Sequence, residues 1–108
     1  MDDKGATPPL APLMELDRVV HEPARLAAMS LLYVVDSADF TFLMNQTGLT
    51  WGNLSAHMSK LEEAGYVEVE KIFKGRRPNT SFRLTPQGRT AFHEYVKMMK
   101  QVFKEFPA

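Results

Sequence analysis

The chain of 108 residues is long enough for one domain with a modest core and too short for two. Its 44% hydrophobic and 24% charged residues are ordinary for a soluble globular protein, and the absence of cysteine excludes disulfides, thiolate metal sites and cysteine nucleophiles. The N-terminus does not resemble a signal peptide, and no apolar run approaches the roughly 18 residues of a membrane span, so we expect a cytoplasmic protein with no membrane partner.

Charge is distributed unevenly along a chain whose net charge is zero. Residues 1–40 carry seven acidic and three basic side chains, whereas residues 71–89 carry six basic side chains and no acidic one. Such asymmetry can create a local positive field on a neutral molecule. From charge alone, a patch that binds an acidic partner such as DNA and a solvated basic loop are equally good interpretations.

The first third of the chain predicts an arm followed by two helices. Residues 1–12 contain three prolines and a glycine, which favour a flexible or extended arm. Pro23 suits the first turn of the second helix, which ends in the apolar sequence LLYVV and is therefore expected to be buried on most sides. Before it, a short amphipathic helix that ends near His21 is predicted from apolar residues at helical spacing: Leu13, Leu16, Val19 and Val20.

A helix-turn-helix arrangement is predicted for the middle of the chain. A short helix over 40–46, which Asp39 or Ser37 can cap, stops at Gly48, and the next helix begins at Thr50. Two short helices joined by a tight turn that contains glycine form the helix-turn-helix motif.

The second helix of this pair, residues 50–64, is the candidate recognition helix. Thr50 can cap its N-terminus, and Gly65 can close its C-terminus in the left-handed conformation. The side opposite its apolar stripe carries small and hydrogen-bonding residues, so another surface can approach it closely. The stripe itself, which we expect to face the core, consists of Leu54, Met58 and Leu61.

Alternation of apolar and polar residues after this helix predicts a β-hairpin with a basic tip. Strands over 66–73 and 81–85 flank residues 74–80, which are rich in turn formers. Thr85 and Pro86 then supply the capping hydroxyl and the N1 proline of another helix.

This last helix is long and runs to about Phe103. The order of elements predicts an α+β, mainly helical fold. It is a winged helix-turn-helix domain over 13–106, with a two-stranded hairpin as the wing and a long C-terminal helix.

Two segments carry a family resemblance: Leu54-Ser-x-His57-x-x-x-Leu61-Glu62-x-Ala64-Gly65-Tyr66-Val67, and Leu84-Thr85-Pro86-x-Gly88-Arg89. Together they resemble winged-helix regulators of the MarR/ArsR type, and most closely the small single-domain branch with a long C-terminal helix. The resemblance covers roughly residues 15–103. It implies a dimeric transcriptional regulator that inserts the second helix of the motif into the major groove of DNA.

The resemblance also leaves room for a small-molecule effector between the long helix and the DNA-binding core, although no residue of the sequence identifies the pocket. The cysteines of many ArsR-type metal sensors are absent, so thiolate metal sensing is not carried over.

The predicted DNA contacts lie on the recognition helix and on the wing, residues 74–80. Asn53 can bond a base or a phosphate, and Gly52 and Ala56 let the helix lie close to the DNA. The full set on the helix is Thr50, Gly52, Asn53, Ser55, Ala56, His57, Ser59 and Lys60. The wing adds Lys74, Arg76 and Arg77, whose phosphate contacts give affinity that falls with salt.

Two residues of the recognition helix allow alternative roles. His57 lies between the core stripe and the outer face, so it either donates to a phosphate or hydrogen-bonds within the domain. Trp51, directly after the cap, either packs on the preceding helix or touches a sugar or a thymine methyl group, and packing is the better interpretation.

The two terminal helices carry more apolar side chains than one small domain easily covers. We therefore predict a homodimer, whose two-fold axis would place two recognition helices about 34 Å apart. The alternative, that both helices fold onto their own core, must be partly true. The predicted dimer residues are Leu13, Leu16, Val20, Phe92, Tyr95, Met99, Val102, Phe103 and Phe106.

The sequence thus predicts a sequence-specific regulator of transcription that binds double-stranded DNA, most consistently a repressor. A winged-helix module for protein–protein interaction without DNA binding is the alternative. No enzyme, cofactor or metal site is expected, because no nucleophile–base pair or phosphate-binding glycine loop is present and His21, His57 and His93 lack metal-ligand spacing.

Overall fold

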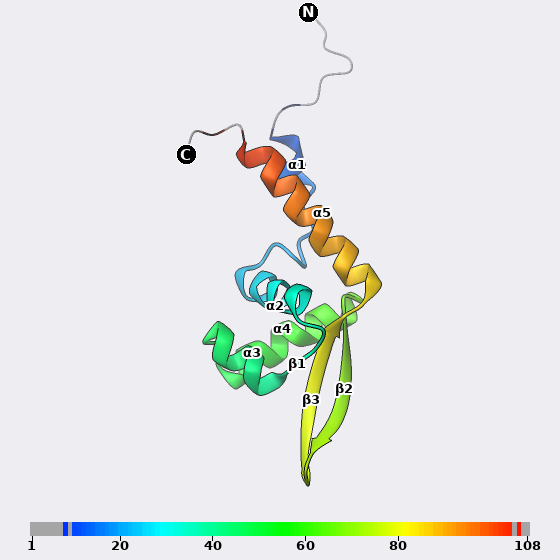
Figure 1. Cartoon of the computed structure of the whole chain (residues 1–108). Helices are drawn as coiled ribbons and strands as arrows, with labels where there is room; N and C mark the ends of the chain where they lie inside the picture. Colours follow the sequence, from blue (N-terminus) through cyan, green and yellow to red (C-terminus); the bar gives the residue numbers. More distant parts are fainter. Residues whose placement is uncertain (1–7, 9, 105, 107–108) are drawn as a thin grey trace, which may run out of the picture.

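The computed structural model describes residue 8, residues 10–104 and residue 106. Along this part of the chain, helices and strands follow one another in the predicted order, and the mainly helical winged-helix architecture is confirmed (Figure 1). The elements are α1 (Ala11–Met14), α2 (Pro23–Val34), β1 (Ala38–Asp39), α3 (Phe40–Thr47), α4 (Trp51–Glu63), β2 (Val67–Lys74), β3 (Arg77–Leu84) and α5 (Pro86–Phe103). No helix among the described residues is long and apolar enough to cross a membrane.

The helix-turn-helix forms where capping chemistry predicted it. The carboxylate of Asp39 accepts a hydrogen bond from the backbone N–H of Phe42 and so caps α3, which ends at Gly48 with φ 73°. The hydroxyl of Thr50 accepts a hydrogen bond from the N–H of Asn53 at 3.2 Å and caps α4. These side chains satisfy backbone donors that a helix N-terminus otherwise leaves unpaired.

The predicted first helix is too long. Only α1 is helical, and the chain from residue 15 to residue 22 runs in turns. The cause is Asp17, whose carboxylate accepts hydrogen bonds from the N–H groups of Val19 and Val20, because such local bonds compete with the helical pattern. Asp17 also accepts a hydrogen bond from the hydroxyl of Tyr66, and burial together with this bond raises the pKa of Tyr66 to about 12.

The predicted arm, residues 1–12, falls largely outside the described residues. Where the chain is described, Ala11 already opens α1. This short helix lies beside the far end of α5, so the first and the last helix of the described chain meet at one end of the domain (Figure 1).

The sheet has three strands in the order β1-β3-β2, so the expected two-stranded hairpin gains a short third strand. The predicted turn over 74–80 is also too long, because Lys74 already pairs with Arg77 and only Gly75 and Arg76 form the loop. Gly75 has φ 65°, the conformation that a two-residue hairpin loop requires at its first position. Pro78, which suggested a turn, lies in β3. Because β1 does not extend as far as Pro78, the missing N–H costs no hydrogen bond to β1.

The core lies where α2, α3, α4 and the inner end of the hairpin meet. The apolar stripe of α4 is buried as predicted, with Leu54, Met58 and Leu61 no more than 2% exposed. Leu16 and Val20 reach the same core from the turns that follow α1, since burial depends on where a side chain arrives and not on whether its backbone is helical. Their partners from other elements include Met29, Leu32, Leu43, Phe82, Leu84 and Tyr95.

The start of α5 is locked to the end of α4. The hydroxyl of Thr85 donates to the carbonyl of Gly65 at 2.6 Å and accepts from the N–H of Gly88 at 2.9 Å, while the N–H of Thr85 donates to the carbonyl of Tyr66. Gly88 is buried against that same carbonyl. These bonds fix the direction in which α5 leaves the domain.

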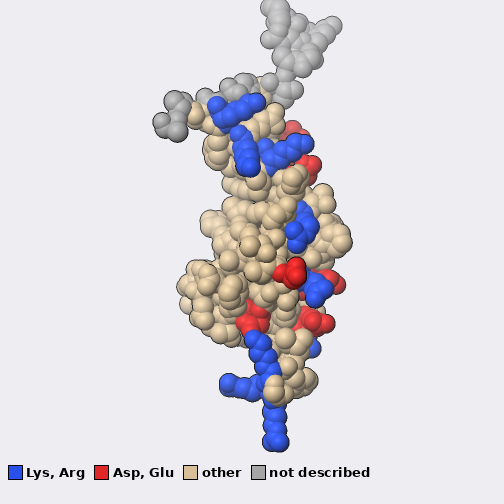
Figure 2. Space-filling view, in the orientation of Figure 1, with Lys and Arg blue, Asp and Glu red and all other residues tan. Residues whose placement is uncertain are grey.

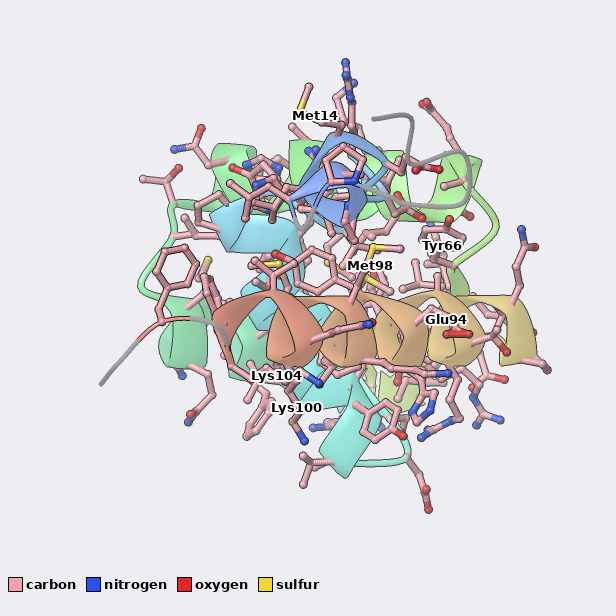
Figure 3. All side chains as sticks on the ribbon, turned by 90° about the horizontal axis from the view of Figure 1, so that it is seen from above. Met14, Tyr66, Glu94, Met98, Lys100 and Lys104 are labelled. Atoms are coloured by element: carbon pink, nitrogen blue, oxygen red, sulfur yellow. The ribbon has the colours of Figure 1, made fainter. Side chains whose placement is uncertain are left out.

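From this anchor α5 projects away from the helix-turn-helix and makes the molecule long. The outer half of α5 reaches α1, while the wing extends from the opposite end of the domain (Figure 1). Seen from above, Met98 lies on the side of α5 that faces α1, whereas Lys100 and Lys104 lie on the opposite side (Figure 3). The winged domain and the outer half of α5 are thus set apart along one axis.

Candidate nucleic-acid interface

The outer face of α4 is exposed and polar. Gly52, Asn53, Ala56, Ser59 and Lys60 are exposed, and Ser55 is half-buried. Thr50 is also exposed, although its hydroxyl is already used as the cap. Every predicted contact on α4 except His57 is therefore accessible to a partner such as DNA. The largest of these side chains, Lys60, lies toward the C-terminal end of the helix.

His57 turns away from that face toward the start of α2. Its Nδ1 lies 3.1 Å from Nη1 of Arg25 and 3.6 Å from a carboxylate oxygen of Glu22. Arg25 is itself held by the carbonyl of Val19, to which its Nε donates at 2.7 Å. Of the two roles weighed for His57, this geometry favours the one within the domain.

The wing carries basic side chains at its outer end, where the hairpin projects farthest from the body (Figures 1 and 2). Arg76 and Arg77 are exposed, and neither forms an ion pair with any acidic residue of the described chain. Lys74 differs, because its Nζ lies 2.6 Å from a carboxylate oxygen of Asp39. The two arginines are therefore the wing's available positive charges.

Asp39 joins the wing to the helix-turn-helix. Besides capping α3 it accepts hydrogen bonds from Lys74 and, at 3.2 Å, from Asn79. Bonding to Lys74 and then to the Phe42 N–H holds the pKa of the Asp39 carboxyl below its ordinary value of 3.8, although burial opposes the shift.

Replacing Asp39 separates its charge from its capping role. Asp39→Ala is expected to lower the free energy of unfolding by about 1 kcal/mol at pH 7, and Asp39→Asn by less, because an amide oxygen still caps. A lowered folded pKa stabilises the native state above pH 3.8 and loses that stabilisation as pH falls through the folded pKa. Urea unfolding across pH 7 to 2 should therefore show wild type and Asp39→Asn converging in acid. A constant gap would mean that the charge contributes nothing.

A groove of about 530 Å³ separates α4 from the wing, and no pattern in the sequence predicted it. One wall presents Trp51, Ser55 and Ser59, which follow one another along one side of α4, and the other presents Lys71 and Asn79 from the hairpin. Its floor is aromatic, with Phe40 and Phe82 at its base. Lys71 was not among the predicted contacts, although it belongs to the acid-free stretch of the chain.

Trp51 both packs and remains accessible. Its ring centroid lies 5.7 Å from that of Phe40, yet 67% of the residue is exposed. Packing on the preceding helix is thus only part of its environment, and Trp51 joins the candidate interface as a residue that the prediction left out.

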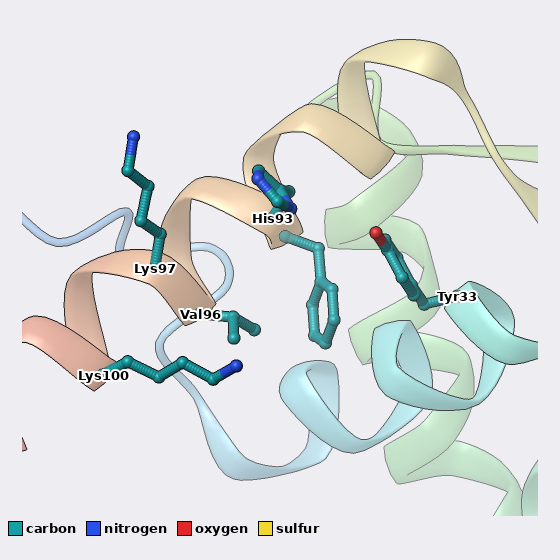
Figure 4. A pocket seen from close by; sticks show the side chains of 6 residues that line it. Tyr33, His93, Val96, Lys97 and Lys100 are labelled. Atoms are coloured by element: carbon teal, nitrogen blue, oxygen red, sulfur yellow. The ribbon is translucent and has the colours of Figure 1, made fainter.

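A second cavity, of about 370 Å³, lies between the end of α2 and α5 (Figure 4). Tyr33, Phe92 and Val96 give it an apolar wall, and Lys97 and Lys100 stand at its side. The guanidinium of Arg89 lies 4.7 Å from the centre of the Tyr33 ring. Apolar rings beside cations suit an anionic aromatic molecule.

The predicted dimer residues divide into two groups. The first, no more than 8% exposed, packs inside this chain: Leu16, Val20, Tyr95 and Val102. The second offers surface to a partner, with Phe103 and Phe106 each 57% exposed and Leu13, Phe92 and Met99 half-buried. Leu10 and Met14 of the α1 region add exposed apolar side chains to this second group. In the described part of the chain, no three His, Asp or Glu side chains gather as metal ligands would.

Comparison with known proteins gives one family and several similar chains. The winged helix DNA-binding domain family matches residues 24–103. An uncharacterized protein of Methanocaldococcus jannaschii is 36% identical over 88 residues, which are 81% of this chain and 95% of that protein.

Two solved structures illustrate the structural likeness. A transcriptional regulator homologue from Pyrococcus horikoshii OT3 has a TM-score of 0.82 and 28% identity, covering 90% of this chain and 95% of its own. A protein assigned to the MarR family of transcriptional regulators from Enterococcus faecalis V583 has a TM-score of 0.69 and 20% identity, covering 97% and 94%. The family match and these two structures confirm the winged-helix fold that the resemblance implied.

Proposed function

Because the chain belongs to the winged helix DNA-binding domain family, we propose that it is a transcriptional regulator that binds double-stranded DNA in a sequence-specific manner. The observation that carries the proposal is the pairing of an exposed, small-residue face on α4 with a wing tip whose arginines have no acidic partner among the described residues. An α-helix fits the major groove, and a basic hairpin beside it reaches the phosphate backbone or the minor groove.

The two elements divide the work. On α4, Asn53 is the residue whose side chain can bond a base edge in two places, and Gly52 and Ala56 keep the helix backbone close to the groove floor. Arg76 and Arg77 add phosphate contacts, which supply affinity but carry no sequence information. Repression is the simplest output of such a protein, since occupying a promoter already excludes polymerase. A cytoplasmic location accords with this role and stays a prediction.

We propose that the regulator acts as a homodimer. The outer half of α5 extends from the winged domain and ends in exposed Phe103, and Phe106 just beyond it is also exposed. Met14 adds an exposed apolar side chain from α1, the helix that lies beside this part of α5. Apolar side chains gathered at one end of a long molecule are typical of an interface. Two-fold pairing there would set two α4 helices on half-sites about one DNA turn apart.

A small-molecule effector is the further partner that the cavity of Figure 4 supports. Its volume of about 370 Å³ lies within the range of ligand sites, and its aromatic wall and lysines suit an aromatic acid. Since the cavity lies between α5 and α2, a ligand there would bear on the angle between the dimer helix and the winged domain. Thermal-shift screening with aromatic acids is the direct search for it.

Arg76→Ala combined with Arg77→Ala tests the function. Wild type should bind random duplex DNA with an affinity that falls as salt rises. The double variant should flatten the slope of log affinity against log salt by about 1.8 for each bound protomer, or about 3.6 for a dimer, because each lost phosphate contact contributes about 0.9. Fluorescence anisotropy at several salt concentrations measures both slopes.

The matched control is Lys97→Ala with Lys100→Ala, which removes the same charge from α5, away from the wing. Its slope should remain that of wild type. If wild type binds no duplex, or binds one equally well at all salt concentrations, the protein–protein interaction module becomes the better interpretation.

A further inference from the structure

Trp51 is the first residue of α4 and places an exposed aromatic side chain at the N-terminus of the proposed recognition helix. In helix-turn-helix proteins the N-terminal residues of this helix contact base edges. Trp51 follows the capping Thr50 directly and is 67% exposed. A large indole exposed to this degree forgoes the burial that would otherwise stabilise the fold, which is consistent with a surface kept for a partner.

The indole is positioned although it is exposed. Its ring packs at 43° to that of Phe40, and the Phe40 ring in turn lies 6.2 Å from the ring of Phe82 in β3. Phe82 is 5% exposed and belongs to the core. A series of three aromatic rings therefore connects the core to the start of α4 and holds the indole at the mouth of the groove beside the wing.

The side chains next to Trp51 can form few hydrogen bonds to bases, so an apolar contact is needed to distinguish one base from another. On the outer face of α4, Gly52 and Ala56 offer no hydrogen bonds from their side chains, and Asn53 alone can bond a base in two places. In the major groove, thymine is the base that presents a C5-methyl group, which apolar side chains recognise by contact.

We infer that Trp51 is a specificity-determining residue that packs against the C5-methyl group of a thymine in the major groove. The inference rests on the proposed DNA binding and adds the base that the helix selects. Lys71 lines the same groove from the hairpin and brings positive charge to the side of the indole that faces the wing, which attracts the DNA backbone. The recognition helix, whose outer face has no arginine, would thus select its site through close approach to the DNA and contact with a thymine methyl group.

The test compares thymine with deoxyuridine, which lacks only the methyl group. Sequences are first selected by wild type from random duplex DNA, and each thymine of the selected site is then replaced by deoxyuridine in turn. At one position in each half-site, wild type should lose about fourfold in affinity for each methyl removed, as expected for one buried methyl group. Trp51→Ala should bind the selected site about tenfold more weakly than wild type and be indifferent to that replacement.

Trp51 is the only tryptophan of the chain, so its fluorescence reports the contact directly. Emission should change on binding the thymine site and change less on binding the deoxyuridine site. Phe42→Ala is the matched control, because Phe42 is a partly exposed aromatic that lines a different cavity, beside β1. This variant should retain the full sensitivity to deoxyuridine, and thermal melting checks that both variants fold.

Two outcomes overturn the inference and leave the proposed function intact. One is that no deoxyuridine replacement weakens wild type; the other is that Trp51→Ala weakens binding to all sequences equally, as loss of a sugar contact would. Failure of wild type to bind any duplex would instead overturn the proposed function together with the inference.

Discussion

Gly88→Ala is expected to lower the free energy of unfolding by about 3 kcal/mol or more and the melting temperature by about 12 °C or more. A Cβ atom at this position would lie 2.0 Å from the carbonyl oxygen of Tyr66 and 2.8 Å from its carbonyl carbon. Both are backbone atoms, so no side-chain rotation relieves the overlap. The Tyr66 carbonyl also accepts the N–H of Thr85 at 3.0 Å, so moving it away breaks the bond that anchors α5.

Gly52→Ala is the matched control, since Gly52 also lies in the first turns of a helix. A Cβ atom there meets nothing within 4 Å. Its expected effect is a gain of about 0.5–1 kcal/mol, because alanine loses less backbone entropy than glycine when a helix forms. Thermal and urea unfolding of the three proteins measure the difference. Equal stability of Gly88→Ala and wild type would show that the start of α5 does not pack against the carbonyl of Tyr66 as described.

Local chemistry was enough to predict most of the helices. Thr50, Thr85 and Asp39 are capping residues placed just before apolar periodic stretches, and each accepts the predicted backbone hydrogen bond. Gly65 likewise takes the left-handed conformation, with φ 80°. Such features depend on a few neighbouring residues, so a single sequence contains the information.

Features that depend on distant residues could not be predicted in this way. The importance of Gly88 comes from the carbonyl of a residue 22 positions earlier, and β1 has only two residues and exists through its pairing with Ser81 and Phe82. The predicted first helix failed because one carboxylate, that of Asp17, captured two backbone N–H groups. For Gly88 and β1 the deciding partner lies far along the chain, whereas Asp17 acts on residues only two and three positions on, through a side-chain bond that apolar periodicity does not reveal.

The candidate site shows the same division. The exposed face of α4 follows from helical periodicity, whereas the pairing of Lys74 with Asp39 and of His57 with Arg25 joins segments 35 and 32 residues apart. The apolar repeat of α5 identified side chains that are expected to be buried, but it does not say whether this chain or a partner buries them. Tyr95 is covered by this chain, and Phe103 is not.

Phe103→Glu combined with Phe106→Glu is expected to convert a dimer into a monomer and to weaken binding to a two-half-site operator by about 100-fold or more. A dimer binds its second half-site as an intramolecular event, and that advantage is typically 10²- to 10⁴-fold. Both rings are 57% exposed, so the stability of the single chain should change little. Light scattering measures the mass, and anisotropy with operators of one and two half-sites measures the binding.

Two comparisons make the result specific to the interface. Affinity for a single half-site should be the same for the variant and wild type, because α4 and the wing are untouched. Phe73→Glu, the same change at a 72% exposed phenylalanine of β2, should leave the mass of the dimer unaltered. Phe92→Glu is unsuitable, because its ring lies 5.1 Å from that of Tyr33 and a carboxylate there would disturb the packing of the chain itself.

If the Phe103→Glu, Phe106→Glu variant remains dimeric, the interface is not at the end of α5. It would then lie along the side of α5, where Tyr33 and Val96 border the cavity of Figure 4. The effector would then bind within the dimer interface, and its binding would report on assembly as well as on the angle of α5.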